Sequence, residues 1–88
     1  MDALIKTYYV PELDTLDVWF GDTTTPVESV EIGDGVISKL GKNGEVISVE
    51  IIGLSKTSKE DLDGLPSDVR SALLEVIRKL CVATSGLA

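Results

Sequence analysis

Residues 33–52 read GDGVISKLGKNGEVISVEII and carry the strongest fold signal in the chain. Two β-prone runs, Val36–Leu40 and Glu45–Ile52, flank a short polar segment that contains Asn43 and Gly44. Asn-Gly between two such runs is typical of a β-hairpin, because both residues tolerate a positive φ. The sequence therefore predicts a tight hairpin around Asn43 and Gly44.

The length of this turn decides which side chains share a face. A two-residue turn pairs Leu40 with Ile47, and a four-residue loop pairs Leu40 with Glu45; both give the same alternation of faces. The more apolar face is expected to meet the core, and it comprises Val36, Ser38, Leu40, Ile47, Val49 and Ile51. The opposite face comprises Ile37, Lys39, Val46, Ser48, Glu50 and Ile52.

Three further strands are expected before this hairpin, at Leu4–Val10, Thr15–Phe20 and Val27–Ile32. Residues 11–14 form a turn signal with a leading proline, so Val10 should pair with Thr15. That pairing assigns to the core face Ile5, Thr7, Tyr9, Leu16, Val18 and Phe20. It assigns to the other face Lys6, Tyr8, Val10, Asp17 and Trp19.

The C-terminal part has a helical pattern. Pro66 suits a first helical turn, and apolar residues follow at helical spacing: Leu65, Val69, Leu73, Val76, Ile77 and Leu80. A helix over residues 65–81 has one apolar stripe and needs the core face of the sheet to cover it. We expect Leu73 and Ile77 to be buried there.

The predicted fold class is α+β, with four or five antiparallel strands in a meander of hairpins and one C-terminal helix on one face. Residues 1–88 form a single domain, with the sheet over residues 4–52 and the helix over residues 65–81. A hydrophobic content of 43% is ordinary for a globular chain and too high for disorder.

Charge and composition exclude several classes of function. The net charge of −7 repels phosphate backbones, so nucleic acid is not an expected partner. No apolar run approaches the roughly 20 residues of a membrane span, and the start of the chain does not resemble a signal peptide. A single cysteine, Cys81, forms no internal disulfide, which favours the reducing cytoplasm.

Most catalytic chemistries lack their usual residues. The chain has no histidine, and Cys81 continues the apolar stripe of the helix as a structural thiol. We predict no catalytic residue, no cofactor and no metal ligand. The acidic residues near the strands have no calcium-loop spacing, although a cluster of them would be the alternative site for a small ligand or divalent cation: Asp14, Asp17, Asp22, Glu31, Asp34 and Glu50. We expect Glu50 to form a structural pair with Lys39.

Aromatic residues on the outer face are the candidate interaction site. Tyr8 and Trp19 share that face with Lys6, which is placed to lie over the indole. Either these residues anchor an interface, or the helix, the tail or a loop covers Trp19. The outer face would be unusually apolar for a monomer, so a homodimer with Trp19 at or near its interface is expected.

Three segments resemble the prokaryotic domain-of-unknown-function family 2283, over residues 8 to about 55. They are YVPELDTLDV at residues 9–18, IGDGVI at residues 32–37 and NGEVISVEI at residues 43–51. Val10 stands where the family has an acid, and Asp17 where it has a second tyrosine. The resemblance implies a small antiparallel β domain and supplies no activity or cofactor. The expected function is a non-enzymatic, self-associating protein-interaction module of uncharacterised role.

Overall fold

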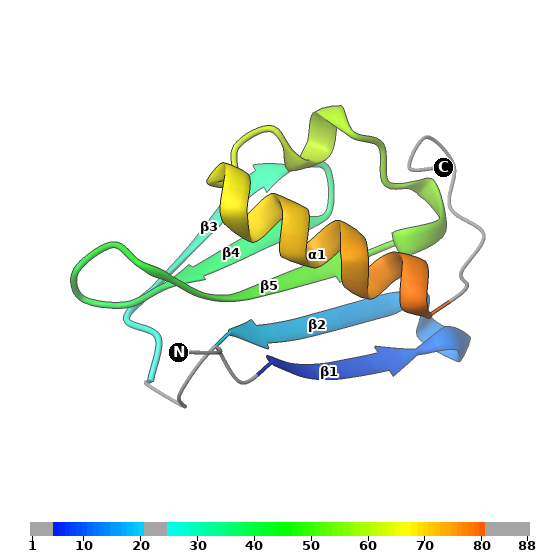
Figure 1. The fold of residues 1–88 in the computed structure, drawn as a ribbon, viewed down its shortest axis with the longest axis horizontal. Helices are drawn as coiled ribbons and strands as arrows, with labels where there is room; N and C mark the ends of the chain where they lie inside the picture. Colours follow the sequence, from blue (N-terminus) through cyan, green and yellow to red (C-terminus); the bar gives the residue numbers. More distant parts are fainter. Residues whose placement is uncertain (1–4, 21–24, 81–88) are drawn as a thin grey trace.

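The computed structural model describes residues 5–20 and 25–80, which form a five-stranded antiparallel sheet with one helix against one face (Figure 1). The strands are β1 (Ile5–Val10), β2 (Thr15–Phe20), β3 (Glu28–Gly33), β4 (Val36–Leu40) and β5 (Val46–Ile52). Three 3-10 turns are η1 (Pro11–Leu13), η2 (Leu54–Lys56) and η3 (Glu60–Leu62), and the helix is α1 (Ser67–Lys79). The predicted α+β class is confirmed.

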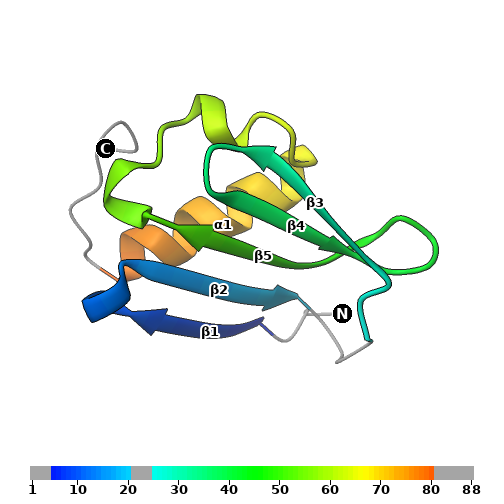
Figure 2. The same ribbon diagram turned by 180° about the vertical axis from the view of Figure 1, so that it is seen from behind.

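The strand order is β1-β2-β5-β4-β3, so the sheet departs from an uninterrupted meander. The last strand, β5, lies between β2 and β4 and joins the N-terminal hairpin to the second group of strands (Figure 2). Ile47, Ser48 and Val49 are three consecutive buried residues of β5. A strand that is covered on both faces gains most from a central position, which explains why β5 is not at an edge.

The N-terminal hairpin has the register that the sequence predicts, with Val10 opposite Thr15 across η1. Asp14 closes the turn at a φ of 55°, in the left-handed region that aspartate tolerates better than most residues. Tyr9 and Phe20 pack against the core, as expected for residues on the helix side of the sheet.

The turn of the central hairpin differs from both expected forms. The Gly44 N–H donates to the Gly41 carbonyl oxygen at 2.9 Å, and Gly44 has a φ of 80°. Asn43 does not adopt a positive φ. Leu40 lies opposite Val46, where the register of β4 and β5 shifts, so the expected pairings of Leu40 with Ile47 or Glu45 are wrong.

The same register shift has a consequence for the two faces. It inserts one extra residue into β5, and the strand beyond it has the register of the two-residue turn, with Ser38 opposite Val49. Val46 therefore packs against the core instead of lying on the outer face, which corrects its expected placement. The outer face is less apolar than the sequence indicated.

The core lies between the sheet and α1. Leu73 and Ile77 are buried in it, as predicted, and α1 falls within the expected range. Its other buried apolar residues come from the sheet and from the segment that precedes the helix: Leu16, Val18, Val36, Val49, Ile51, Leu54, Leu62 and Leu65. In the described ranges, no helix is long and apolar enough to cross a membrane. Cys81 and Asp22 lie outside the described residues.

The segment before α1 is attached to the end of β3. The Asp61 carboxylate accepts hydrogen bonds from the Ser58 N–H at 3.0 Å, the Ser58 hydroxyl at 3.1 Å and the Asp34 N–H at 3.3 Å. Gly33 lies against the backbone of Asp61 so closely that a Cβ at residue 33 would overlap the Asp61 carbonyl oxygen. These contacts hold η3 against one edge of the sheet.

Candidate functional site

The face of the sheet away from α1, here called the open face, carries two rows of side chains that cross all five strands. The first, the Lys6 row, runs through Lys6, Trp19, Ser48, Lys39 and Ser29. The second, the Tyr8 row, runs through Tyr8, Asp17, Glu50, Ile37 and Glu31. Each row places side chains from distant parts of the sequence next to one another.

The structure brings the three candidate interaction residues together. Lys6 lies directly opposite Trp19, and Tyr8 is the next residue of β1 on the same face. Tyr8 is 56% exposed, whereas Trp19 is half-buried. Because α1 packs on the other face, the helix is not what covers Trp19. The tail after Leu80 lies outside the described residues.

The cation over the indole ring is Lys39, not Lys6 as the sequence suggested. The Lys39 Nζ lies 5.3 Å from the centre of the Trp19 ring, within the range of a cation–π contact. Lys39 starts on β4 and reaches Trp19 on β2 across Ser48, which is fully buried. A serine at the middle position is short enough to leave a path for the lysine side chain. No local sequence signal predicts this contact, because it depends on β4 and β2 flanking the same strand.

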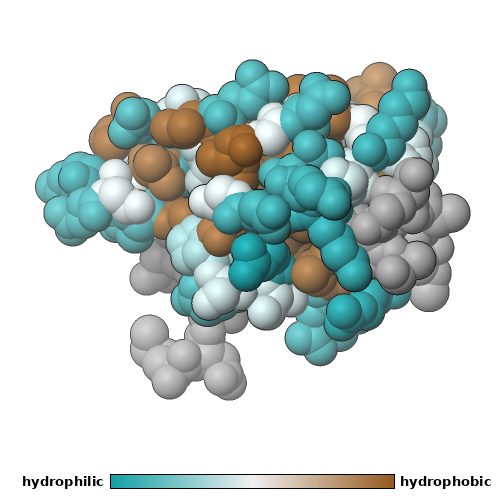
Figure 3. Space-filling view, turned by 90° about the horizontal axis from the view of Figure 1, so that it is seen from above, coloured by the Kyte–Doolittle hydropathy of each residue, from teal (hydrophilic) through white to brown (hydrophobic). Residues whose placement is uncertain are grey.

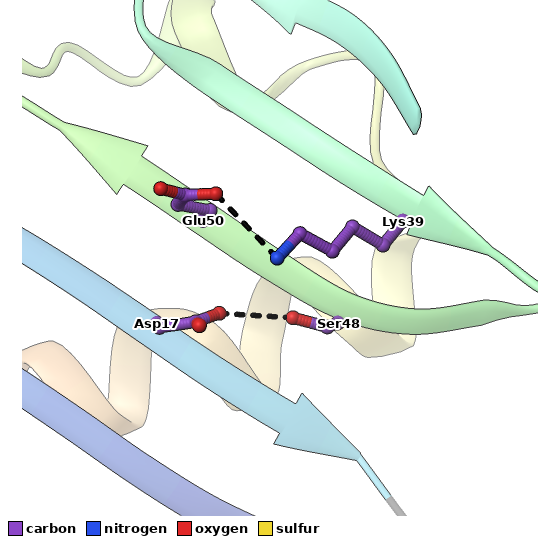
Figure 4. Close-up of polar contacts among 4 residues, drawn as sticks. All are labelled: Asp17, Lys39, Ser48 and Glu50. Carbon is purple, nitrogen blue, oxygen red and sulfur yellow. Dashed lines mark hydrogen bonds and ion pairs between the residues drawn. The ribbon is translucent and has the colours of Figure 1, made fainter. Parts of the chain in front are cut away.

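Lys39 also forms the ion pair that the sequence predicted with Glu50. The Lys39 Nζ lies 3.5 Å from the Glu50 Oε1, as a diagonal contact between β4 and β5 (Figure 4). Beside it, the Ser48 hydroxyl donates to the Asp17 Oδ1 at 3.0 Å. Lys39 thus contacts both an aromatic ring and a carboxylate, which restricts its long side chain to one arrangement.

Asp17 and Glu50 are direct cross-strand neighbours, an arrangement in which like charges repel. Each carboxylate has its own partner, Ser48 for Asp17 and Lys39 for Glu50. Within residues 5–20 and 25–80, no three acidic, cysteine or histidine side chains gather as a metal site would need. Asp14 lies elsewhere and binds Ser55, with 2.6 Å between the Asp14 Oδ2 and the Ser55 hydroxyl.

Exposed apolar side chains gather at the end of the open face near η1. This group, here called the apolar end, comprises Tyr8, Val10, Leu13 and Ile52. Val10 and Ile52 flank Thr15 in one cross-strand row, and Leu13 follows in the adjoining turn. Leu13 is 68% exposed, and the sequence does not predict its part in this group, because a lone leucine in a turn has no periodic pattern. The uncovered apolar surface is therefore narrower than expected and lies beside β1.

The helix side carries a hollow of about 250 Å³ between η3 and α1. Its lining residues are Lys59, Leu62, Asp63, Arg70 and Leu74. Arg70 and Asp63 pair with each other at 3.8 Å, and no hydroxyl, thiol or imidazole lines the hollow. Hydrophilic and hydrophobic residues are interleaved on the side of the molecule shown in Figure 3. Arg70 and Asp63 thus neutralise each other in the hollow, whereas the open face brings the predicted interaction residues together, so the open face is the better candidate site.

Comparison with known proteins places residues of this chain in a protein family. The family model described as Protein of unknown function (DUF2283) matches residues 6–55, which extend from β1 into η2 and cover more than half of the chain. No curated protein and no solved structure matches the chain. The chain belongs to the DUF2283 family.

Proposed function

We propose that this protein is a non-enzymatic protein-interaction module that forms a homodimer, with Tyr8 and Trp19 at or near the interface. The supporting observation is the apolar end, where Tyr8 is 56% and Ile52 is 50% exposed; the half-buried Trp19 lies further along β2, diagonal to Tyr8. Exposed aromatic and aliphatic side chains on a sheet face suit protein contact better than the binding of a small molecule, which needs a concave site.

The polar groups of the open face support the same proposal. Glu50 is engaged by Lys39, and Asp17 by Ser48, so neither carboxylate lacks a neighbour that stabilises it. The face has no histidine or cysteine among its described residues to act as a base or nucleophile. Such a fixed polar surface orients an incoming partner and leaves the apolar end to supply contact area.

The net charge of −7 opposes association of two copies, and the charges near β1 reduce this effect. Lys6 is the only charged residue of β1, whereas β3 carries Glu28 and Glu31, so copies that meet at β1 approach through the less acidic edge of the sheet. Screening at physiological salt acts over about 8 Å, which weakens repulsion between distant carboxylates. The single cysteine is consistent with placing the module in a reducing cytoplasm.

Sedimentation at micromolar concentration tests the proposal. The wild-type chain is expected to sediment as a dimer, and Tyr8→Ala and Trp19→Asp are expected to shift it towards the monomer. Val27→Asp is the matched control, since Val27 is 65% exposed and precedes β3 at the far edge. A wild-type monomer with a red-shifted, solvent-exposed tryptophan would contradict the proposal. A dimer that resists both substitutions would remove Tyr8 and Trp19 from the interface.

A further inference from the structure

The outer side of β1 is an unpaired strand edge within the described part of the chain. Among the described strands, β1 pairs only with β2. Its sequence, IKTYYV, contains no proline and one charged residue, Lys6, and its register with β2 has no bulge. Proline, charged side chains (lysine above all) and bulges are the means by which proteins usually prevent an edge strand from pairing with another chain. Lys6 is the one such feature of β1, and its side chain lies on the open face opposite Trp19, so the backbone edge itself is open to pairing.

The register of the sheet determines which backbone groups of β1 point outward. The Ile52 N–H donates to the Gly35 carbonyl oxygen at 2.8 Å, so the backbone of Ile52 faces β4. Alternation along a strand turns the backbone of Ile51 towards β2, where its partner is Leu16. By the same alternation Thr15 and Asp17, on either side of Leu16, face β1.

The partners of Thr15 and Asp17 on β1 are Val10 and Tyr8, whose backbone groups face β2 in return. The intervening residues Ile5, Thr7 and Tyr9 therefore direct their N–H and C=O groups away from the sheet. The hydrogen bonds of the described turns and loops do not use these groups. Three residues with outward donors and acceptors form a template for one more antiparallel strand.

A second copy of the same strand fits this template. Antiparallel pairing about a two-fold axis at Thr7 opposes Thr7 to the partner's Thr7, and Ile5 to the partner's Tyr9. Every outward-facing residue then meets an outward-facing residue, as hydrogen bonding requires. The same register places Lys6 opposite the partner's Tyr8 on the open face.

Charge complementarity favours this register. In this register the Lys6 row of one copy continues into the Tyr8 row of the other. Lys6 then lies next to the partner's Tyr8, and the partner's Asp17 is the following residue in that row, in the direction in which the Lys6 side chain can extend. By symmetry the contact occurs twice. Moving the axis to Tyr8 would instead oppose Lys6 to the partner's Val10 and lose this complementarity.

We infer that the homodimer forms by antiparallel pairing of β1 with β1 of a second copy, joining the two five-stranded sheets into one continuous sheet. This inference rests on the proposed function and names the surface through which self-association occurs. Tyr8 lies in the interface itself. Trp19, opposite Lys6 on β2, lies one strand behind it.

A proline scan separates this interface from other dimer contacts. Thr7→Pro removes an N–H that points outward, so β1–β2 pairing is retained while one interchain hydrogen bond and its mirror copy are lost. The expected result is a folded monomer in sedimentation and circular dichroism. Thr7→Val keeps the N–H and a high β-propensity, and is expected to remain dimeric. Tyr8→Pro removes an inward N–H and is expected to lower the melting temperature of the monomer fold as well.

Disulfide trapping gives a second measurement that does not depend on the proline variant folding. Thr7→Cys in a Cys81→Ser background is expected to form a covalent dimer under mild oxidation, since hydrogen-bonded antiparallel partners have Cα atoms about 5.5 Å apart. Ser29→Cys in the same background is the control, because Ser29 is an exposed residue of the opposite edge strand β3. Equal trapping at both positions would mean random collision and would overturn the inference.

The outcomes distinguish the inference from the proposal on which it rests. A wild-type monomer would overturn both. A dimer that survives Thr7→Pro, is not trapped through Thr7→Cys and dissociates with Tyr8→Ala would overturn strand pairing and retain the interaction module. Trapping at Thr7 alone, together with loss of the dimer in Thr7→Pro, is the expected result.

Discussion

The two edges of the sheet are built differently. β3 carries Glu28 and Glu31, has a register shift between Glu31 and Gly33, and is contacted at its end by η3. β1 has one lysine, a regular register with β2 and no described strand on its other side. Charges, bulges and covering segments are the means by which proteins prevent edge pairing. In this protein they are concentrated at β3, which indicates that the β1 edge is the one available for contact.

Leu73→Ala has the largest expected effect on the comparison, because both edges depend on the common core beneath α1. Leu73 is fully buried, so its truncation is expected to lower the free energy of unfolding by about 2–5 kcal/mol. Glu75→Ala, at an exposed position of the same helix, is the control and should change it by less than about 0.5 kcal/mol. Urea unfolding measures both. Equal stability of the two variants would show that α1 does not hold the sheet together.

Gly33→Ala tests the protection of the β3 edge. The added Cβ would overlap the Asp61 carbonyl oxygen, so η3 must move away from β3. Overpacking of this kind costs about 1–3 kcal/mol. We expect a loss of stability in this range, together with faster hydrogen exchange at the Asp34 N–H. Ser29→Ala on the same strand should leave both the stability and the exchange rate of the Asp34 N–H unchanged. If Gly33→Ala also changed neither quantity, η3 would not be held against the β3 edge.

The pH dependence of stability gives a finer test of the same edge. The Ser58 N–H first, and then the Ser58 hydroxyl and the Asp34 N–H, stabilise the charged carboxylate and lower the pKa of Asp61 below its usual 3.8. A depressed pKa contributes stability that is present above pH 3.8 and is lost as the pH falls through the folded-state pKa.

Asp61→Asn is therefore expected to be less stable than the wild type at neutral pH, with a difference that narrows below about pH 4. Unfolding by urea at both pH values measures this difference. Glu60→Gln, at an exposed position of η3, is the matched control and should follow the wild type at both. A difference for Asp61→Asn that stays constant with pH would remove the carboxylate from the attachment of η3.

Cation binding has the smallest expected effect. A cation bound along the Tyr8 row would use the acidic residues of that row as ligands. Those residues would then serve a binding site instead of protecting the β3 edge from pairing. Asp17 and Glu50 have their own partners, so we expect no heat from a calorimetric titration with micromolar calcium, magnesium or zinc. Binding that disappears in Glu50→Gln would make the small-ligand and cation alternative the leading function. Glu12→Gln, in η1, serves as the control.

Local sequence determined the hairpins and the helix. The pairing of Val10 with Thr15 follows from a turn of four residues, and the burial of Leu73 and Ile77 follows from helical spacing. These features depend on neighbours in the chain, where loop length and the alternation of side chains leave few arrangements. The position of Tyr8 on the open face also follows from the alternation of side chains along β1. Even the ion pair of Lys39 with Glu50 lies within one hairpin.

Only the tertiary structure decided how the two groups of strands meet. The pairing of β2 with β5 joins residues far apart in the sequence, and it depends on which strand gains most by being buried. That choice put Lys39 rather than Lys6 over Trp19, since Lys39 reaches β2 only when β5 lies between. It also left β1 at an edge. A periodic pattern specifies the faces of a strand but not its lateral neighbour, because the backbone hydrogen bonds that join strands are the same for every residue except proline.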